Sequence, residues 1–232
     1  MNINTYTSEE DFSTDDYTHA MSETGVFVAQ FSKPIDILKV IQKIGKPHSH
    51  NGDGAYVWDI KPIPGKTSAT VARSQTNEEF VFHTDCSFEF PPPTYVALYV
   101  IQEDRLGGGI TQLVKFEDVE RLLPGNTVQI LRTLYKVKIP KEFFKGQEYI
   151  EASIIYGNHQ ISFRRDCIVN SECTSEQLKA LDVLEEIIQR KELSRNLLLK
   201  NGSVLFLDNT RYLHARTAIL DDSRHLQRIR YW

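Results

Sequence analysis

Short strand-like segments separated by turn residues constrain the fold of this chain more than any other feature. From residue 80 onward the sequence contains FVFHTDCSF, then TYVALYVIQ after three prolines, GITQLV after three glycines, and later SVLFLDN and QRIRYW. GVFVAQF, near the N-terminus, has the same character. Apolar runs of this length, bounded by glycine and proline, are typical of strands. Many short strands with few helices predict a mainly β chain with peripheral helices (α+β), built as a sandwich or jelly-roll barrel.

Two segments predict helices on the outside of this strand-rich core. Thr174 and Gln177 form a capping box ahead of residues 175–193, where Leu and Ile recur at helical spacing. A shorter amphipathic helix is expected within residues 36–45, which end on a glycine.

The connections between these elements give two further expectations. Residues 151–156 and 159–164 flank a Gly-Asn pair and predict a β-hairpin. Residues 46–68 are rich in Gly, Pro, Ser and Asn and predict a long loop, which could act as a lid. Because no linker or repeat divides the sequence, we expect residues 1–232 to form a single domain.

Composition excludes several classes of partner. The formal net charge of −4 and a pI of about 6.0 argue against a protein that binds nucleic-acid backbones. The longest clean apolar stretch, residues 95–101, is far too short to span a membrane. Three cysteines without a CxxC spacing predict reduced thiols, and the acidic, polar N-terminus does not resemble a secretion signal. We therefore expect a cytoplasmic protein with a small-molecule substrate and neither a nucleic-acid nor a membrane partner.

One histidine is followed two residues later by an acid, and its surroundings predict a metal site. His83 and Asp85 lie in an apolar strand-like segment, where a spacing of two puts both side chains on one face. His214 follows another apolar strand and is the best third ligand, which gives a two-histidine, one-carboxylate triad. His48 and His50 lie in the polar loop and are expected to be solvated.

Arginines concentrate around the third of these residues. Four of them follow His214 within 16 residues: Arg216, Arg224, Arg228 and Arg230. A guanidinium repels a metal ion, but it pairs with carboxylates through two parallel hydrogen bonds. The pattern therefore predicts an anionic co-substrate bound beside the metal.

Taken together and in order, these motifs resemble a known family. The chain is similar to Fe(II)/2-oxoglutarate-dependent dioxygenases of the taurine dioxygenase and clavaminate synthase-like branch, over roughly residues 25–31 and 72–232, with an insertion at 127–175 matched only loosely. The resemblance implies a double-stranded β-helix, a jelly-roll barrel of the cupin-like kind. It rests on five motifs: His83-Thr84-Asp85, Gly108-Gly109-Ile110-Thr111, Asp208-Asn209, His214-Ala215-Arg216-Thr217 and Arg224-His225-Leu226-Gln227-Arg228.

The resemblance also implies roles for individual residues. His83, Asp85 and His214 would bind Fe(II), and Arg224 with Thr111 would bind the distal carboxylate of 2-oxoglutarate, the co-substrate used with O2. Arg228 would hold the carboxylate of an amino-acid substrate, although the short gap between His214 and Arg224 leaves Arg228 open as the 2-oxoglutarate anchor instead. Three further residues could reach the substrate: Arg73, Glu79 and Phe88.

The carboxylate at position 85 favours hydroxylation, because halogenating relatives have a small residue there. The expected reaction is hydroxylation of an unactivated C–H bond in a small metabolite, a free amino acid or an amino-acid-derived biosynthetic intermediate, with release of succinate and CO2. Three alternatives stay open: a substrate tethered to a carrier, desaturation, and a cupin-like barrel that binds a metal or small anion without oxidative turnover.

Overall fold

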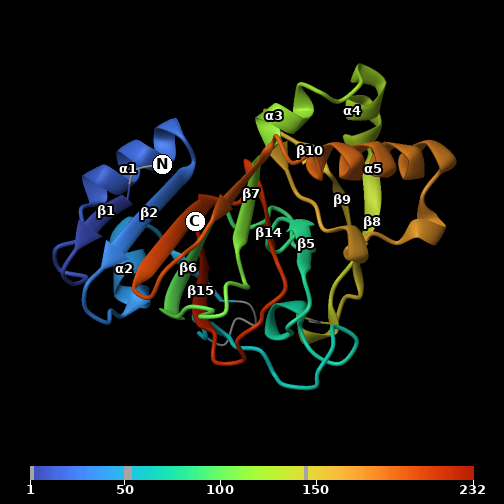
Figure 1. Cartoon of the computed structure of the whole chain (residues 1–232). Coiled ribbons are helices and arrows are strands. Elements are labelled where there is room, and N and C mark those ends of the chain that lie inside the picture. The colour runs from blue at the N-terminus through green and yellow to red at the C-terminus, as the bar shows by residue number, and fades with distance from the viewer. Residues whose placement is uncertain (1–2, 50–53, 144–145) are drawn as a thin grey trace.

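Two β-sheets form the framework of the computed structural model, which describes residues 3–49, 54–143 and 146–232 (Figure 1). The large sheet is antiparallel except for the parallel pair β1–β2, and its strand β15 also pairs with the short strand β4 (Trp58–Ile60). Its order is β1 (Ile3–Tyr6), β2 (Val26–Phe31), β13 (Ser203–Asp208), β6 (Tyr95–Gln102), β15 (His225–Tyr231) and β3 (Pro47–His48). The small sheet has the order β12 (Ser194–Leu197), β7 (Thr111–Lys115), β14 (Tyr212–Arg216) and β5 (Phe80–His83).

Apolar side chains from both sheets meet between them. Val28, Val96 and Leu205 of the large sheet lie in one buried cluster with Leu113 and Tyr212 of the small sheet. No strand pair among the described residues joins the two sheets, so they face each other as a jelly roll and do not close into one hydrogen-bonded barrel. The predicted fold class, mainly β with peripheral helices, is confirmed.

Helices α1 (Thr14–Glu23) and α2 (Ile37–Ile44) cover the outer face of the large sheet (Figure 1). The predicted helix within 36–45 is confirmed as α2, and its N-cap Asp36 accepts a hydrogen bond from the Leu38 backbone. Helix α1 was not expected, because its sequence is mostly polar and only Tyr17 and Met21 are buried.

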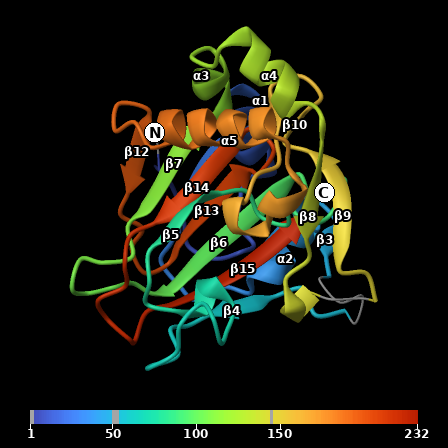
Figure 2. The ribbon, with the colours of Figure 1, turned by 90° about the vertical axis from the view of Figure 1, so that its right-hand side faces the viewer.

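A second group of elements covers the other side, where α5 (Ser175–Ile188) runs across the strands of the small sheet (Figure 2). The capping box at its start is present as predicted, but the helix ends at residue 188 instead of 193, where the sequence turns polar. This layer also contains α3 (Phe116–Glu120), α4 (Gly125–Leu131), β8 (Leu134–Lys138), β9 (Tyr149–Ser153) and the short helical turns η2 (Lys141–Phe143), η3 (Arg165–Cys167) and η4 (Asn170–Glu172).

Two sequence-based expectations about connections need correction. The expected hairpin of 151–156 with 159–164 shrinks to β10 (Ile155–Tyr156) and β11 (Gln160–Ile161), because β9 pairs with β8 instead. Residues 46–68 are not one continuous loop, because they contain the short strands β3 and β4, which both pair with β15.

The histidine pair of that segment also differs from expectation. His48 is not simply solvated: its Nε2 lies 2.8 Å from Oε2 of Glu89. His50 lies outside the described residues. No helix among the described residues has both the length and the apolar character that crossing a bilayer requires.

Candidate active site

His83, Asp85 and His214 lie close together at buried positions, where β5 pairs with β14 in the small sheet. His83 is the last residue of β5 and lies opposite His214 of β14, with their ring centres 4.3 Å apart. Oδ1 of Asp85 lies 3.8 Å from Nε2 of His83 and 3.9 Å from Nε2 of His214. All three side chains are buried, and one potential ligand atom from each lies within 4.8 Å of the others. Two imidazoles and one carboxylate at this spacing can hold a divalent metal from one side.

Asp85 reaches this position by a route that the sequence argument did not foresee. Strand β5 ends at His83, so Asp85 does not lie on the strand, and the next residue, Cys86, has a positive φ of 55°. The side chain of Asn209 holds this turn: its Oδ1 accepts from the Asp85 backbone N–H at 2.7 Å, and its Nδ2 donates to the Asp85 carbonyl at 2.9 Å. Asn209 thus fixes the direction of the carboxylate.

The protonation states suit a metal site. Nδ1 of His83 lies 2.8 Å from the Val81 carbonyl, which can only accept, so Nδ1 carries the proton and Nε2 presents its lone pair. Burial is the main reason that the pKa of His83 lies well below its usual range, and the neighbouring imidazole of His214 lowers that pKa further. Burial lowers the pKa of His214 to about 4. Both imidazoles are therefore neutral at physiological pH, as metal ligands must be.

Two buried arginines hold the carboxylate in its ionised form. Nη1 of Arg228 lies 3.2 Å from Oδ1 of Asp85, and Nε of Arg230 donates to Oδ2 at 2.8 Å. Burial alone would raise the pKa of Asp85, but these two charges hold it well below its usual range. The two arginines are two residues apart on β15 and so point to one side. Sequence reasoning noted Arg230 only as part of an arginine run, although this spacing was a usable signal.

A cavity of about 50 Å³ adjoins the two histidines and contains the predicted anion-binding residues. Thr111, Arg224 and Arg228 all line it together with His83 and His214. Nη1 of Arg224 and Nε of Arg228 are buried there without a hydrogen-bond partner among the described residues. Buried donors of this kind normally have a partner. Two unpaired guanidinium edges in one cavity therefore indicate a site for an anion.

Glycine makes room for one of these two arginines, Arg224. Gly109 has a φ of +62°, and a Cβ there would lie 2.6 Å from Nε of Arg224. Burial lowers the pKa of Arg224 to about 10, so it stays charged at neutral pH. Arg216, by contrast, donates to the backbone carbonyls of Thr76 and Glu78 and holds that segment in place.

The residues expected to reach the substrate separate into two groups. Arg73 and Phe88 line a second small cavity, which His83 and Asp85 also line. Glu79 is exposed and lines a different hollow with Val81, so the structure does not bring it to the metal residues. Arg164 lines the same small cavity as Arg73, and sequence reasoning missed it because it lies far from every motif.

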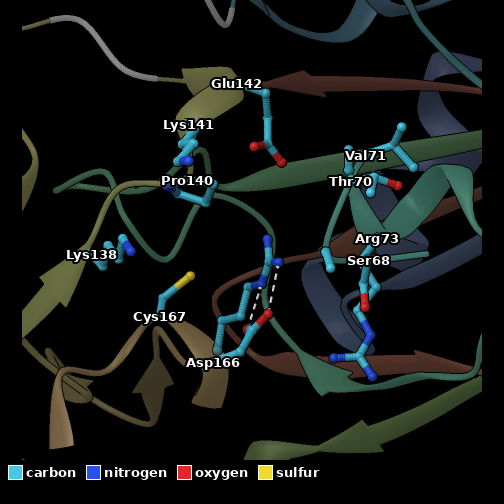
Figure 3. A pocket seen from close by; sticks show the side chains of 13 residues that line it. Ser68, Thr70, Val71, Arg73, Lys138, Pro140, Lys141, Glu142, Asp166 and Cys167 are labelled. Atoms are coloured by element: carbon cyan, nitrogen blue, oxygen red, sulfur yellow. Dashed lines mark hydrogen bonds and ion pairs between the residues drawn. The ribbon is translucent and has the colours of Figure 1, made fainter. Parts of the chain in front are cut away.

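That small cavity shares part of its wall with a larger one of about 420 Å³ (Figure 3). Arg73, Arg164 and Glu142 line both. In Figure 3, Lys138, Pro140 and Lys141 lie on one side of the opening, and Ser68, Thr70 and Arg73 lie on the other. The wall on this second side begins where the expected lid, residues 46–68, ends.

No curated protein matches the chain in sequence. Solved structures match it in fold. An asparagine oxygenase in complex with Fe(II), 2S,3S-3-hydroxyasparagine and succinate is 18% identical, with a TM-score of 0.80, over 96% of this chain and 81% of its own. The non-heme iron oxygenase OrfP in complex with Fe and alpha-ketoglutaric acid is 16% identical, with a TM-score of 0.73, over 94% and 78%. These likenesses confirm the double-stranded β-helix.

A family model for the taurine catabolism dioxygenase TauD, TfdA family matches residues 26–230. The match spans nearly all of both sheets. It confirms the predicted enzyme class, with iron as the metal and 2-oxoglutarate and O2 as co-substrates, and it sets aside the alternative of a binding barrel without turnover. The chain therefore belongs to the TauD/TfdA family of dioxygenases.

Proposed function

We propose that this dioxygenase hydroxylates a C–H bond of a free amino acid or an amino-acid-derived intermediate, at an iron held by His83, Asp85 and His214. The observation that carries the proposal is the pairing of two neutral, buried imidazoles with an ionised carboxylate beside a cavity that contains unpaired guanidinium edges. When bound, the iron would supply the activation of O2 that couples decarboxylation of 2-oxoglutarate to oxidation of the substrate.

The protein residues would bind and orient the two organic molecules. We assign the distal carboxylate of 2-oxoglutarate to Arg224 and Thr111, because Nη1 of Arg224 has no partner among the described residues and Thr111 lines the same cavity. Arg228 is already engaged with Asp85 through Nη1, which makes it the weaker candidate for that role. The remaining Nε of Arg228 supports the predicted contact to a substrate carboxylate.

Two observations support an amino acid as the substrate. The first is this second unpaired guanidinium edge beside the metal residues. The second is that two structurally similar oxygenases were solved with hydroxylated amino acids: the asparagine oxygenase with 2S,3S-3-hydroxyasparagine, and OrfP with (3S)-hydroxy-L-Arg. A cytoplasmic location belongs to the same proposal and is supported by the three free cysteines.

An anaerobic titration tests the metal and co-substrate sites directly. Fe(II) followed by 2-oxoglutarate should produce the weak visible charge-transfer band of a chelated keto acid. Replacement of Arg224 by Gln should raise the 2-oxoglutarate concentration needed for the band about 10- to 100-fold, the value of one charged hydrogen bond. The exposed Arg195, on the edge strand β12, provides the matched control as Arg195→Gln.

Turnover is then tested with O2 and a panel of amino acids. Succinate release that depends on one amino acid, together with a gain of one oxygen atom in that amino acid, is the expected result. A loss of two hydrogens without added oxygen would indicate desaturation. A folded protein that binds iron but gives no band with 2-oxoglutarate would refute the proposal.

A further inference from the structure

The larger cavity lies next to the small cavity that His83 and Asp85 line. It shares Arg73, Arg164 and Glu142 with the small cavity beside His83 and Asp85. Glu142 and Asp166 extend into it from opposite walls (Figure 3). The three charged residues that line both cavities therefore lie close to a molecule bound beside His83 and Asp85.

The lining of this cavity is positive in a chain that is negative overall. Four cationic side chains face two acidic ones, whereas the whole chain carries a formal charge of −4. One acid and one cation offset each other, because Asp166 accepts from Nε and Nη2 of Arg164 at 2.8 and 3.0 Å. The remaining lining charges, Arg73, Lys138 and Lys141 against Glu142, are still positive in sum. Lys138, Lys141 and Glu142 make no ion pair with any described residue, so their charges are available to a ligand.

Arg164 is the innermost of these cations. Its side chain is only 15% exposed, and its guanidinium lies 5.4 Å from the centre of the Phe80 ring. Phe80 in turn stacks on His83, with ring centres 3.7 Å apart and planes 12° from parallel. One aromatic ring thus separates Arg164 from a metal-site histidine. Nη1 of Arg164 has no hydrogen-bond partner among the described residues.

Arg73 reaches the same ring from the other wall of the cavity. Its guanidinium lies 5.7 Å from the centre of Phe80, and its only hydrogen bond to a described residue runs from Nε to the Glu79 carbonyl. Two guanidinium groups therefore flank one ring, each with donors left over, next to the metal residues. Besides the substrate carboxylate assigned to Arg228, this arrangement suits a second carboxylate, on the substrate's side chain, far better than it suits a cationic or neutral side chain.

We propose that the substrate is an amino acid with an acidic side chain, such as aspartate, glutamate or a close derivative. The inference rests on the proposed function. The side-chain carboxylate pairs with Arg164 and Arg73, and Glu142 offers the one unpaired acid for the α-ammonium group. The exposed Lys138 and Lys141 attract the anion to the opening. Arginine and lysine are disfavoured, because their side chains would bring a third positive charge between two guanidinium groups.

A binding assay separates this inference from the function on which it rests. The anaerobic protein is loaded with Fe(II) and 2-oxoglutarate, and the charge-transfer band is recorded first. Aspartate, glutamate, asparagine, glutamine and arginine are then added in turn, and each shift of the band is titrated. The expected result is a saturable shift at the lowest concentration for an acidic amino acid, at least about tenfold below its amide. Under O2, the same amino acid should give the highest succinate release.

Two variants locate the selectivity within the cavity. Arg164→Gln should weaken binding of the acidic amino acid about 10- to 100-fold. The difference in affinity between the acidic amino acid and its amide should become smaller. Arg165→Gln is the matched control, because Arg165 points away to an ion pair with Glu185 and does not line the cavity. If Arg164→Gln does not fold, the half-buried Arg73 carries the same test as Arg73→Gln.

The outcomes of the binding assay distinguish failure of the substrate assignment from failure of the proposed function. A band that shifts equally or better with asparagine, glutamine or arginine overturns the inference and leaves the dioxygenase function intact. A band that no acidic amino acid shifts also overturns it. Absence of the band itself would refute the proposed function, and the inference would fall with it.

Discussion

Arg230 offers the sharpest test of how the metal residues are held in place. It is 2% exposed, and its Nε donates to Oδ2 of Asp85 at 2.8 Å, on the side of the carboxylate away from the histidines. Replacement by Met keeps much of the volume and removes the charge. The carboxylate would then stay buried with a single cationic partner, Arg228.

The expected loss of stability follows from two opposing effects. Breaking a buried ion pair by removing one partner costs about 3–5 kcal/mol, because the other charge stays desolvated. Arg228 still contacts Asp85, and loss of Arg230 also relieves repulsion between the two arginines, since Arg230 contributes to the lowered pKa of Arg228. We therefore expect Arg230→Met to lower the free energy of unfolding by about 3 kcal/mol, the lower end of that range.

Urea unfolding of the metal-free protein provides the assay, as a double-mutant cycle of Arg230→Met with Asp85→Asn. The coupling energy between the two sites should exceed about 1 kcal/mol. Arg195→Met, on an exposed edge strand, should change stability by no more than about 0.5 kcal/mol. Addition of Fe(II) should stabilise Arg230→Met more than the parent, because the metal restores a positive charge beside Asp85. Additive single effects would show that Arg230 does not hold the carboxylate.

Two further predictions follow from the same site. Gly109→Ala would place a Cβ 2.6 Å from Nε of Arg224 and should raise the 2-oxoglutarate concentration needed for the charge-transfer band about tenfold. Gly107→Ala is the control, because Gly107 also has a positive φ, of +85°, but a Cβ there would have no neighbour within 4 Å. Equal effects of the two substitutions would contradict the assigned role of Arg224. For the metal-free protein, the pKa of His214 is about 4 when folded and about 6.5 when unfolded, so the unfolded chain binds more protons between these values and stability should fall as the pH drops through this window. His214→Gln should reduce that slope by up to about 1.4 kcal/mol per pH unit, whereas His19→Gln, at an exposed position, should leave it unchanged; the two variants are compared by urea unfolding at several pH values.

Local sequence patterns predicted those parts of the structure that depend on neighbouring residues. Strand β13, for example, could be predicted because it contains a short apolar run, and all six of its residues are buried in the structure. The start of α5 was visible because its cap lies within four residues. The unexpected α1 shows the limit of this approach: only two buried residues attach it to the sheet, too few to leave a periodic signal.

The sequence predicted those residues of the candidate site that belong to short, recognisable motifs. The spacing of His83 and Asp85, a histidine after a later strand and the following arginines were enough to nominate the residues that the structure brings together. The geometric reason given for the first pair was wrong, however. Asp85 faces the histidines through a turn held by Asn209, which lies 124 residues away, and not through strand alternation.

What the sequence determined by itself is the kind of chemistry: residue types at short spacing that favour a metal, an anionic co-substrate and a strand-rich scaffold. The tertiary structure alone decided which charges meet at the metal residues. Arg230 contacts Asp85 across 145 residues, and Arg164 is brought to Phe80 from a distant segment. Such contacts depend on how the two sheets and the layer that covers the small sheet pack, because a buried charge must find its partner in space, whatever the distance along the chain.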